Sequence, residues 1–304
     1  MQLGLETCQL CPRRCGTDRR AAAGYCGAPE HLAVAAVCIH RGEEPPLAGL
    51  VNVFFAHCNL HCIYCQNHAI SGRMVNPSYI HYNTLDTLAD RIAALLPQSN
   101  GLLGLVSASH YAHLVEPLLQ ALHLRGMHPT VVYNSSGYER VETLQRLEGL
   151  VDIYLPDLKY MDPTLAEACS HAPDYPAVAA AALKEMQRQV GASLKTDERG
   201  VAFRGMVVRH LVLPGHVENS LQCLEWLADN FPLSTHLSLM AQYFPPKAGL
   251  PAPLDRTLTA GEYVLVTDRY TALGFTRGWL QSLDAESHYR PDFNRTDNPF
   301  EPIP

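Results

Sequence analysis

The sequence lacks the features that place a chain in a membrane or on a secretory route. It has no signal-peptide core at its N-terminus and no run of about 18 apolar residues. Its net charge of −7 at pH 7 provides no general electrostatic attraction to nucleic acid or to a membrane surface. It also lacks internal repeats and low-complexity segments. We therefore expect a cytoplasmic protein that binds neither nucleic acid nor membrane.

Cysteine, by contrast, is plentiful, with ten residues in a chain of 304. In a cytoplasmic protein this usage indicates metal ligands rather than disulfides. One group has the spacing C-x2-C-x3-C-x10-C, in a segment too short to bury a core of its own. Four thiolates on tight turns suit either tetrahedral zinc or a second, closed iron–sulfur cluster, and a structural role is favoured over a redox one. This group is Cys8, Cys11, Cys15 and Cys26.

A second group, Cys58, Cys62 and Cys65, follows a short apolar segment at 51–55 with the spacing C-x3-C-x2-C. Iron–sulfur clusters normally take four cysteine ligands, so three thiolates on a [4Fe-4S] cluster leave one iron open to a substrate or cofactor. Zinc is the alternative, with a nearby histidine as its fourth ligand. Buried free thiols are a poorer interpretation, because the loop is polar and the cysteines are close together. The histidines near this loop are His57, His61 and His68.

From residue 51 onward, apolar strand-like segments alternate with helical patterns, which predicts a parallel sheet with crossover helices. Polar residues gather at the ends of these strands, as in barrels whose site lies on the C-terminal face. Six strand–helix units, rather than eight, predict an α/β fold with an open, partial (β/α)6 TIM-like barrel. An open doubly wound sheet is the alternative, but no G-x-G-x-x-G follows the first strand, which excludes its nucleotide-binding form. The strands are expected at 51–55, 102–106, 130–133, 151–155, 207–213 and 237–240.

We divide the chain into three parts. Residues 1–48 form a cysteine-rich metal-binding unit and a connector, 49–250 form the barrel, and 251–304 form a C-terminal helix and an extended tail. Glu43 and Glu44 lie in a turn-rich connector and are expected to be exposed. Strand alternation places one of Arg209 and His210 inside the barrel and the other outside.

The cysteine loop, with Tyr64 just before its last cysteine, resembles the signature of the radical S-adenosylmethionine (SAM) superfamily. From Cys8 to about Pro245, the chain resembles the PflX-like iron–sulfur proteins, which are relatives of pyruvate formate-lyase activating enzymes. The motifs that carry this resemblance lie at 8–16, 42–47, 54–67, 133–139, 152–160 and 211–216.

The resemblance implies a [4Fe-4S] cluster that donates one electron to SAM, giving methionine and a 5′-deoxyadenosyl radical. That radical takes a hydrogen atom from the substrate. In activating enzymes the substrate is a glycine of a glycyl-radical enzyme, and the implied electron donor is a flavodoxin or ferredoxin. A small-molecule or peptide substrate is the alternative within this class. The alternative outside this class is a non-catalytic iron–sulfur or zinc protein that serves in sensing or electron transfer.

The sequence departs from the activating enzymes at three places. Residues 107–110 read Ser-Ala-Ser-His where many activases have a Gly-Gly-Glu turn for the SAM amino group. No cysteine lies between Cys65 and Cys169, so a ferredoxin-like insert is absent there. Gln242 and its neighbours stand where the activase has a histidine. These differences bear on the substrate more than on the radical chemistry.

The predicted site consists of the three loop cysteines and polar residues at the strand ends. Asp157 and Lys159 match an Asp-x-Lys motif of the activases, and strand alternation puts both on one face. A simple salt bridge at the barrel rim is the alternative. Local turn and capping roles are the alternatives for Asn67 and Ser136. The complete set of predicted cofactor-binding residues is Asn67, Ser107, His110, Asn134, Ser136, Asp157 and Lys159.

Overall fold

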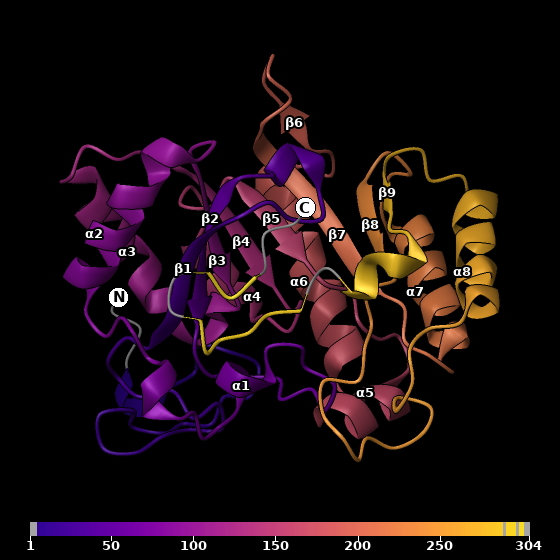
Figure 1. The fold of residues 1–304 in the computed structure, drawn as a ribbon, viewed down its shortest axis with the longest axis horizontal. Coiled ribbons are helices and arrows are strands. Elements are labelled where there is room, and N and C mark those ends of the chain that lie inside the picture. The colour runs from indigo at the N-terminus through magenta and orange to yellow at the C-terminus, as the bar shows by residue number, and fades with distance from the viewer. Residues whose placement is uncertain (1–4, 288–289, 296–297, 301–304) are drawn as a thin grey trace.

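The computed structural model describes residues 5–287, 290–295 and 298–300 (Figure 1). Within these residues nine strands form one sheet in the order β1-β2-β3-β4-β5-β7-β8-β9, and β6 pairs with β7. The strands are β1 (Val34–His40), β2 (Leu50–Phe55), β3 (Leu102–Val106), β4 (Thr130–Ser135), β5 (Ile153–Pro156), β6 (Lys195–Thr196), β7 (Ala202–Leu211), β8 (His236–Met240) and β9 (Gly278–Leu280).

The sheet is parallel except at one edge and at the β6 hairpin. Strand β1 pairs antiparallel with β2, whereas β2, β3, β4, β5, β7, β8 and β9 all run parallel to their neighbours in chain order. A helix follows each parallel strand from β2 to β8. The main helices are α2 (Leu85–Leu95), α3 (Val115–His123), α4 (Val141–Arg146), α6 (Tyr175–Val190), α7 (Val217–Asn230) and α8 (Ala260–Leu273).

These six strand–helix units confirm the predicted partial (β/α)6 barrel. Because neighbouring strands follow chain order, the strand order never reverses, and the doubly wound alternative is excluded. Sequence reasoning missed the short strands β6 and β9, which have two and three residues. It also missed the short helix α1 (His68–Ser71), and a further helix, α5 (Pro163–Ser170), follows β5.

The parallel strands are apolar on both faces because both faces are covered. On the outer face, residues such as Val53, Leu105 and Tyr133 pack beneath the helices in the main core. Inside the barrel, Leu50, Leu102 and other aliphatic side chains form a smaller core toward the β6 end. The opposite end of the barrel interior remains available to polar side chains.

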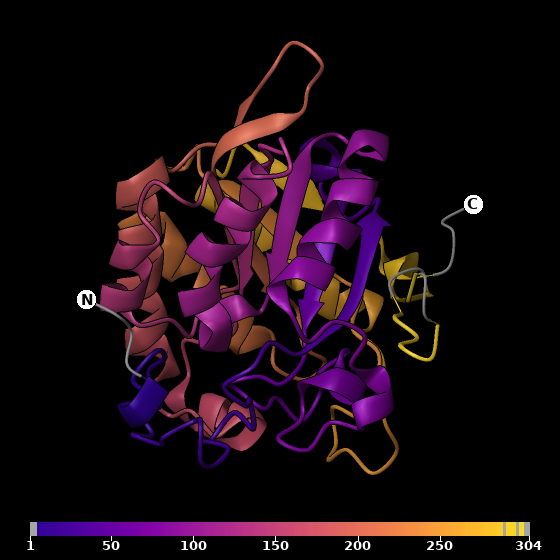
Figure 2. The same cartoon turned by 90° about the vertical axis from the view of Figure 1, so that its left-hand side faces the viewer.

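The polar strand ends, the cysteine loop and the N-terminal residues all lie at one end of the molecule, opposite the β6 hairpin (Figures 1 and 2). The C-terminal segment, which includes the 3-10 helix η6 (Leu283–Ser287), runs along the open side of the sheet. There Phe293 and Phe300 pack on Phe54, each with ring centroids 5.7 Å apart. Residues 1–4 of the predicted N-terminal unit and 301–304 of the predicted C-terminal tail lie outside the described residues. The boundaries between the three predicted parts of the chain remain a prediction.

No helix in the described part of the chain combines the length and the apolar character needed to span a bilayer.

Gly104 on β3 should be essential for packing inside the barrel. A Cβ atom at this position would collide with Asn52 Oδ1 and Leu50 Cδ1. We expect Gly104→Ala to lower the free energy of unfolding by about 1–3 kcal/mol, because overpacking forces neighbouring side chains to shift. Urea unfolding followed by circular dichroism measures this loss. Gly261→Ala is the matched control, because a Cβ atom there meets open space in α8; an equal loss in both variants would contradict the packing argument.

Candidate functional site

The three loop cysteines follow β2 at the end of the sheet where all parallel strands finish. Two residues of this loop, His57 and His61, have positive φ angles of 70° and 60°. The His57 ring lies 3.1 Å from the Gly72 carbonyl oxygen, and the His61 ring stacks on Tyr25 with centroids 4.8 Å apart. Among the described residues, no set of three or more His, Cys, Asp or Glu side chains is arranged around a single ion. A cluster differs from such a site, because each thiolate binds a different iron.

Each loop sulfur receives a hydrogen bond from the protein. Ser170 donates to Cys62 Sγ at 3.0 Å, and Ser71 donates to Cys65 Sγ at 3.2 Å. The backbone N–H of Leu60 donates to Cys58 Sγ at 3.4 Å. Donors aimed at sulfur favour the thiolate form that metals bind. The donor set therefore fits an iron–sulfur cluster.

Burial opposes ionisation of Cys58 and Cys62. Desolvation raises the pKa of Cys58 to about 12, and the neighbouring loop thiols add to the effect. Burial likewise raises the pKa of Cys62, although Lys159 nearby opposes it. A bound metal deprotonates a coordinating thiol outright. Cys58 and Cys62 are therefore suited to metal binding and poorly suited to act as free nucleophiles.

A chain of hydroxyl groups connects the cysteine loop to β5 and α5. The Tyr64 hydroxyl lies 2.6 Å from the Tyr160 hydroxyl, which lies 2.7 Å from Ser170 Oγ. Ser170 in turn reaches Cys62. Both tyrosines are buried, so their hydroxyls require partners within the protein. This chain fixes the orientation of the hydroxyl that contacts the Cys62 sulfur.

Asp157 and Lys159 lie on one face at the end of β5, as strand alternation predicted. Lys159 Nζ donates to Asp157 Oδ2 at 2.6 Å, so the salt-bridge alternative is present in the structure. Burial disfavours the ammonium, but Asp157 and then Cys62 outweigh burial and raise the pKa of Lys159 above its ordinary value. Tyr175 holds this segment, because its hydroxyl accepts from the Lys159 N–H at 2.9 Å. A fixed cation thus stands close to the loop thiols.

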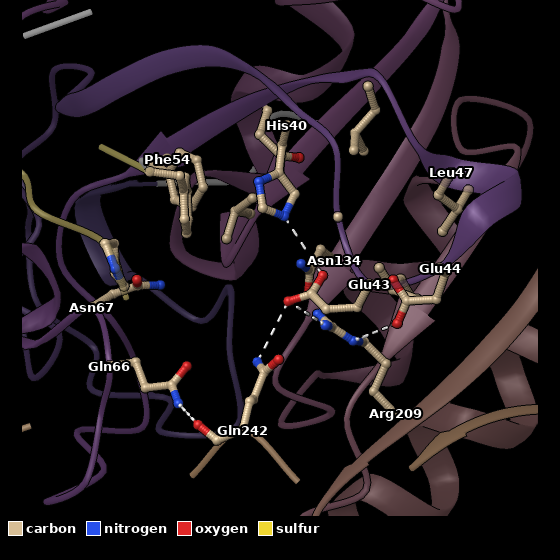
Figure 3. A pocket seen from close by; sticks show the side chains of 17 residues that line it. His40, Glu43, Glu44, Leu47, Phe54, Gln66, Asn67, Asn134, Arg209 and Gln242 are labelled. Carbon is tan, nitrogen blue, oxygen red and sulfur yellow. Dashed lines mark hydrogen bonds and ion pairs between the residues drawn. The ribbon is translucent and has the colours of Figure 1, made fainter. Parts of the chain in front are cut away.

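Two predicted residues, Asn67 and Asn134, line a cavity of about 120 Å³ inside the barrel (Figure 3). Ser107 lies next to this region with a left-handed backbone (φ 55°), and its N–H donates to the Asn134 carbonyl at 2.8 Å. The structure therefore brings the ends of β2, β3 and β4 together around one space. Contact of these side chains with a cofactor remains a prediction.

Ser136 and His110 do not line this cavity. Ser136 Oγ accepts from the Tyr138 N–H at 3.4 Å, a local turn role. The buried His110 ring has Nε2 2.7 Å from the Ala56 carbonyl oxygen, and burial lowers the pKa of His110 to about 3. These two residues stabilise the loops around the site, and a direct cofactor contact from either one is untested.

The N-terminal cysteines lie on tight turns beside the cysteine loop. Cys8 closes one turn, with its N–H donating to the Thr17 carbonyl at 3.0 Å. Cys8, Cys11 and Cys26 are buried, whereas Cys15 is exposed. Burial raises the pKa of Cys11 to about 12, and negative charge on Cys26 and Cys8 would raise it further. Cys8, Cys11 and Cys26 are thus close enough to influence one another, but the four thiols are not arranged around a single ion, and a metal site here remains a prediction.

Arg13 fastens this N-terminal unit to the cysteine loop. Its guanidinium donates to the carbonyls of Asn59 and Ser170 at 3.0 and 3.1 Å, and also to that of His171. The same group lies over the Tyr25 ring, 4.1 Å from the centroid. The two cysteine groups therefore belong to one packed region.

Sequence reasoning missed the charged cluster in the cavity. Glu43 and Glu44, expected to be exposed, are largely buried and pair with Arg209, which is the inward residue of β7 (Figure 3). Arg209 Nη2 lies 3.1 Å from Glu43 Oε1, and Nε lies 3.0 Å from Glu44 Oε1. The correction has a physical reason, since an inward arginine requires counter-ions that only a distant segment provides. Alternation from the apolar Val207 was the signal that could have shown Arg209 to face inward.

The two glutamates respond differently to this environment. Burial alone would raise the pKa of Glu43, but Arg209 beside it holds that pKa well below its usual range. Burial raises the pKa of Glu44, and the negative charge of Glu43 adds to the shift.

Of the two neighbouring residues on β7, His210 is the one that faces outward. Its ring lies between the Leu158 carbonyl oxygen and Ser220 Oγ.

A third buried carboxyl group, Glu139, ties β4 to the end of β3. Ser109 and Ser135 both donate to Glu139 Oε1, the second at 2.7 Å. Burial raises the pKa of Glu139 from its ordinary value of 4.5 to about 7, despite these two hydrogen bonds. Its protonation therefore changes within the physiological pH range.

No protein-family model matches the chain. It is 26% identical over 263 residues to an uncharacterized protein of Methanocaldococcus jannaschii, covering 84% of this chain and 72% of that protein. Its fold is similar to that of methylornithine synthase, with a TM-score of 0.46 and 13% identity over 70% of this chain and 59% of that chain. A domain of a Bacteroides vulgatus pyruvate-formate lyase-activating enzyme gives a TM-score of 0.34 and 13% identity, over 66% of this chain and 96% of the domain. Similarities this distant do not assign an activity.

We expect Glu139 to make stability depend on pH. The unfolded chain loses this proton near pH 4.5, whereas the folded protein keeps it until about pH 7, so the contribution of Glu139 falls as pH rises through that window. From pH 4 to pH 8, the stability of the wild type should fall by about 3 kcal/mol relative to Glu139→Gln. Urea unfolding at a series of pH values measures this difference. Glu198→Gln, which alters an exposed carboxylate, should follow the wild-type profile; parallel profiles for Glu139→Gln and wild type would refute the assignment.

Proposed function

We propose that the protein is a radical SAM enzyme in which Cys58, Cys62 and Cys65 bind a [4Fe-4S] cluster. The observation that carries the proposal is the sulfur-directed donor set on a loop that adjoins the barrel cavity. A metal carrier needs the thiols but has no use for a polar cavity beside them. The residue that follows Cys65, Gln66, already lines that cavity.

When bound, the cluster and SAM supply one electron and, by breakage of a carbon–sulfur bond, a 5′-deoxyadenosyl radical that takes a hydrogen atom from the substrate. The chain's own residues orient these groups. Lys159 would meet the SAM carboxylate, and its bond to Asp157, which orients the ammonium, supports this role. Asn67, Ser107 and Asn134 provide polar groups at the neighbouring strand ends.

His110 and Ser136, also proposed for this cofactor pocket, would act through the loops that they hold. His110 connects the turn after β3 to Ala56, directly before the cysteine loop. Ser136 accepts hydrogen bonds within the turn after β4 and contacts Tyr175 through its carbonyl at 2.8 Å. Both roles fix the shape of the pocket wall.

The N-terminal unit is proposed to bind zinc or a second iron–sulfur cluster and to cover the cysteine loop. Tyr25 stacks on His61, and Arg13 donates hydrogen bonds to the adjacent carbonyl groups of Asn59 and Ser170. In this proposal the unit thereby restricts the access of water to the thiols. In this role the metal is a staple for a segment that has little core of its own.

For the substrate, we propose a glycine of a partner protein, which would make the enzyme an activase of a glycyl-radical enzyme supplied with electrons by a flavodoxin or ferredoxin in the cytoplasm. The resemblance to activating enzymes supports this proposal. A small molecule or a peptide is the alternative substrate.

Reductive cleavage of SAM is the direct test. We expect anaerobically reconstituted, dithionite-reduced protein to form 5′-deoxyadenosine from SAM, measured by liquid chromatography. The triple variant Cys58→Ala, Cys62→Ala, Cys65→Ala should form none, because no ligands for the cluster remain. Cys38→Ala is the control, since it removes a buried thiol outside both cysteine groups and should retain activity. A wild type that carries a full cluster and forms no product would favour a sensing or electron-transfer protein.

Ser170 should tune the bound cluster. Hydrogen bonds to the ligand sulfurs stabilise the more negative, reduced state, so their loss lowers the reduction potential. We expect Ser170→Ala to shift the midpoint potential to a more negative value, measured by a redox titration followed by electron paramagnetic resonance. Ser193→Ala removes a hydroxyl that bonds the Ser234 carbonyl far from the cysteines, and it should leave the potential unchanged. Equal potentials in both variants and the wild type would show that the contact to Cys62 has no electronic effect.

A further inference from the structure

The barrel has an open side between its two edge strands. Strand β1 lies at one end of the strand order and β9 at the other, and no pairing joins them within the described residues. The C-terminal residues 290–295 and 298–300 run along this side, and we call these two ranges the strap (Figure 1). Two strap residues, Pro291 and Phe300, are among those that line the barrel cavity. The strap therefore forms part of the cavity wall on the open side.

Aromatic rings hold the strap against β1 and β2. Phe293 and Phe300 both pack on Phe54, with ring centroids 5.7 Å apart in each pair. The Phe300 ring also lies against that of His40 on β1, with centroids 4.6 Å apart. Phe54 is buried, and the strap provides part of its cover.

The strap also contacts segments on both margins of the open side. The Tyr79 hydroxyl, in the segment between β2 and α2, donates to Asn294 Oδ1 at 3.2 Å. On the other margin, the Arg290 guanidinium lies 4.5 Å from the centroid of the Phe244 ring, which follows β8. The strap thus bridges a gap that no strand fills in the described part of the chain.

Among the described residues, side chains alone fasten the strap to the barrel. No backbone hydrogen bond joins 290–295 or 298–300 to a strand or helix there, and the bond from the Asp292 N–H to the Pro299 carbonyl, at 2.7 Å, lies within the strap. A strand that closed the barrel permanently would share a ladder of backbone hydrogen bonds with β1 or β9. Segments held by few contacts open locally while the rest of the protein stays folded.

Cys38 on β1 lies beneath the strap. It is opposite Asn52 in the pairing of β1 with β2, and Asn52 lines the cavity, so both side chains are on the inner face of the sheet. Cys38 is 2% exposed and belongs to the same apolar cluster as Phe54 and Phe293. A thiol reagent therefore reaches Cys38 when the strap moves away or when the whole protein unfolds.

We propose that the strap is a displaceable cover, which leaves the open side in a local equilibrium while the barrel stays folded. A molecule reaches the cavity from this side only when the strap has left. The rings of Phe293 and Phe300 hold the closed state, so the loss of either ring shifts the equilibrium toward the open state. This inference goes beyond the proposed function and does not depend on it, since it concerns access to the cavity and not the chemistry at the cysteine loop.

Thiol labelling of the full-length protein tests this cover. The native protein reacts with N-ethylmaleimide for increasing times and is then unfolded in an isotope-labelled form of the same reagent, and mass spectrometry of its peptides gives the rates at Cys38 and Cys223. Cys223 is fully buried in α7, so its rate follows global unfolding. We expect Cys38 to react at least about tenfold faster than Cys223, because local opening requires less free energy than global unfolding.

Variants of the strap contacts should change one rate and not the other. Phe293→Ala should raise the rate at Cys38 by about tenfold or more, because a buried ring that holds the closed state is lost. Tyr79→Phe, which removes one hydrogen bond to the strap, should raise that rate by about twofold to fivefold. Both variants should leave the rate at Cys223 nearly unchanged. Phe203→Ala, which removes an exposed ring on β7, is the matched control and should change neither rate.

Circular dichroism and thermal melting of each variant identify any loss of fold. Because Tyr79→Phe removes only a hydroxyl group, it tests the strap even if Phe293→Ala is unstable. Equal rates at Cys38 and Cys223 in the wild type, or a parallel rise of both rates in the strap variants, would overturn the proposal. The labelling requires neither a cluster nor SAM, so this result would refute the cover alone. Faster labelling of Cys38 without SAM cleavage would refute the proposed function and leave the cover in place.

Discussion

The parallel direction of β2, β3, β4, β5, β7, β8 and β9 determines where the polar groups of this protein meet. Each strand has its neighbours in chain order, so the ends of β2, β3, β4 and β5 lie at the same edge of the sheet. The cysteine loop, the Ser107 turn, Asn134 and the Asp157–Lys159 pair are brought together by this one constraint. Without this shared edge, the three loop thiols would have no polar pocket beside them.

Desolvation is the second determinant of the site. The pKa values of Cys58 and Cys62 rise because the loop is packed beneath α5 and the N-terminal unit, while Lys159 keeps its charge because Asp157 pairs with it. The protein thereby holds two thiols that resist ionisation and a fixed cation in one place. A metal ion or cluster that displaces the thiol protons would leave anionic sulfurs beside that cation, so the charges there are arranged in advance.

The sequence allowed prediction of those features that depend on local patterns. Alternating strand and helix segments predicted the six units of the barrel, and strand alternation predicted that Asp157 and Lys159 share a face. The charged cluster escaped prediction because Glu43 and Glu44 sit in a polar, proline-rich connector, which by itself suggests exposure. Their counter-ion is Arg209 on β7, and only the curvature of the sheet brings the two segments together. The contact of His110 with Ala56 escaped prediction for a related reason, since its partner is a backbone carbonyl and no sequence pattern indicates that contact.

Arg13 lies between Cys11 and Cys15 in the chain, and its guanidinium holds carbonyl groups of the cysteine loop and of the last turn of α5. Whatever orders the N-terminal cysteines must therefore also reduce the freedom of the loop that carries Cys58 and Cys62. Thermodynamic linkage is reciprocal, so metal binding at either of the two proposed sites would strengthen binding at the other to the same degree. Through Arg13, filling one cysteine group would lower the entropy cost of filling the other.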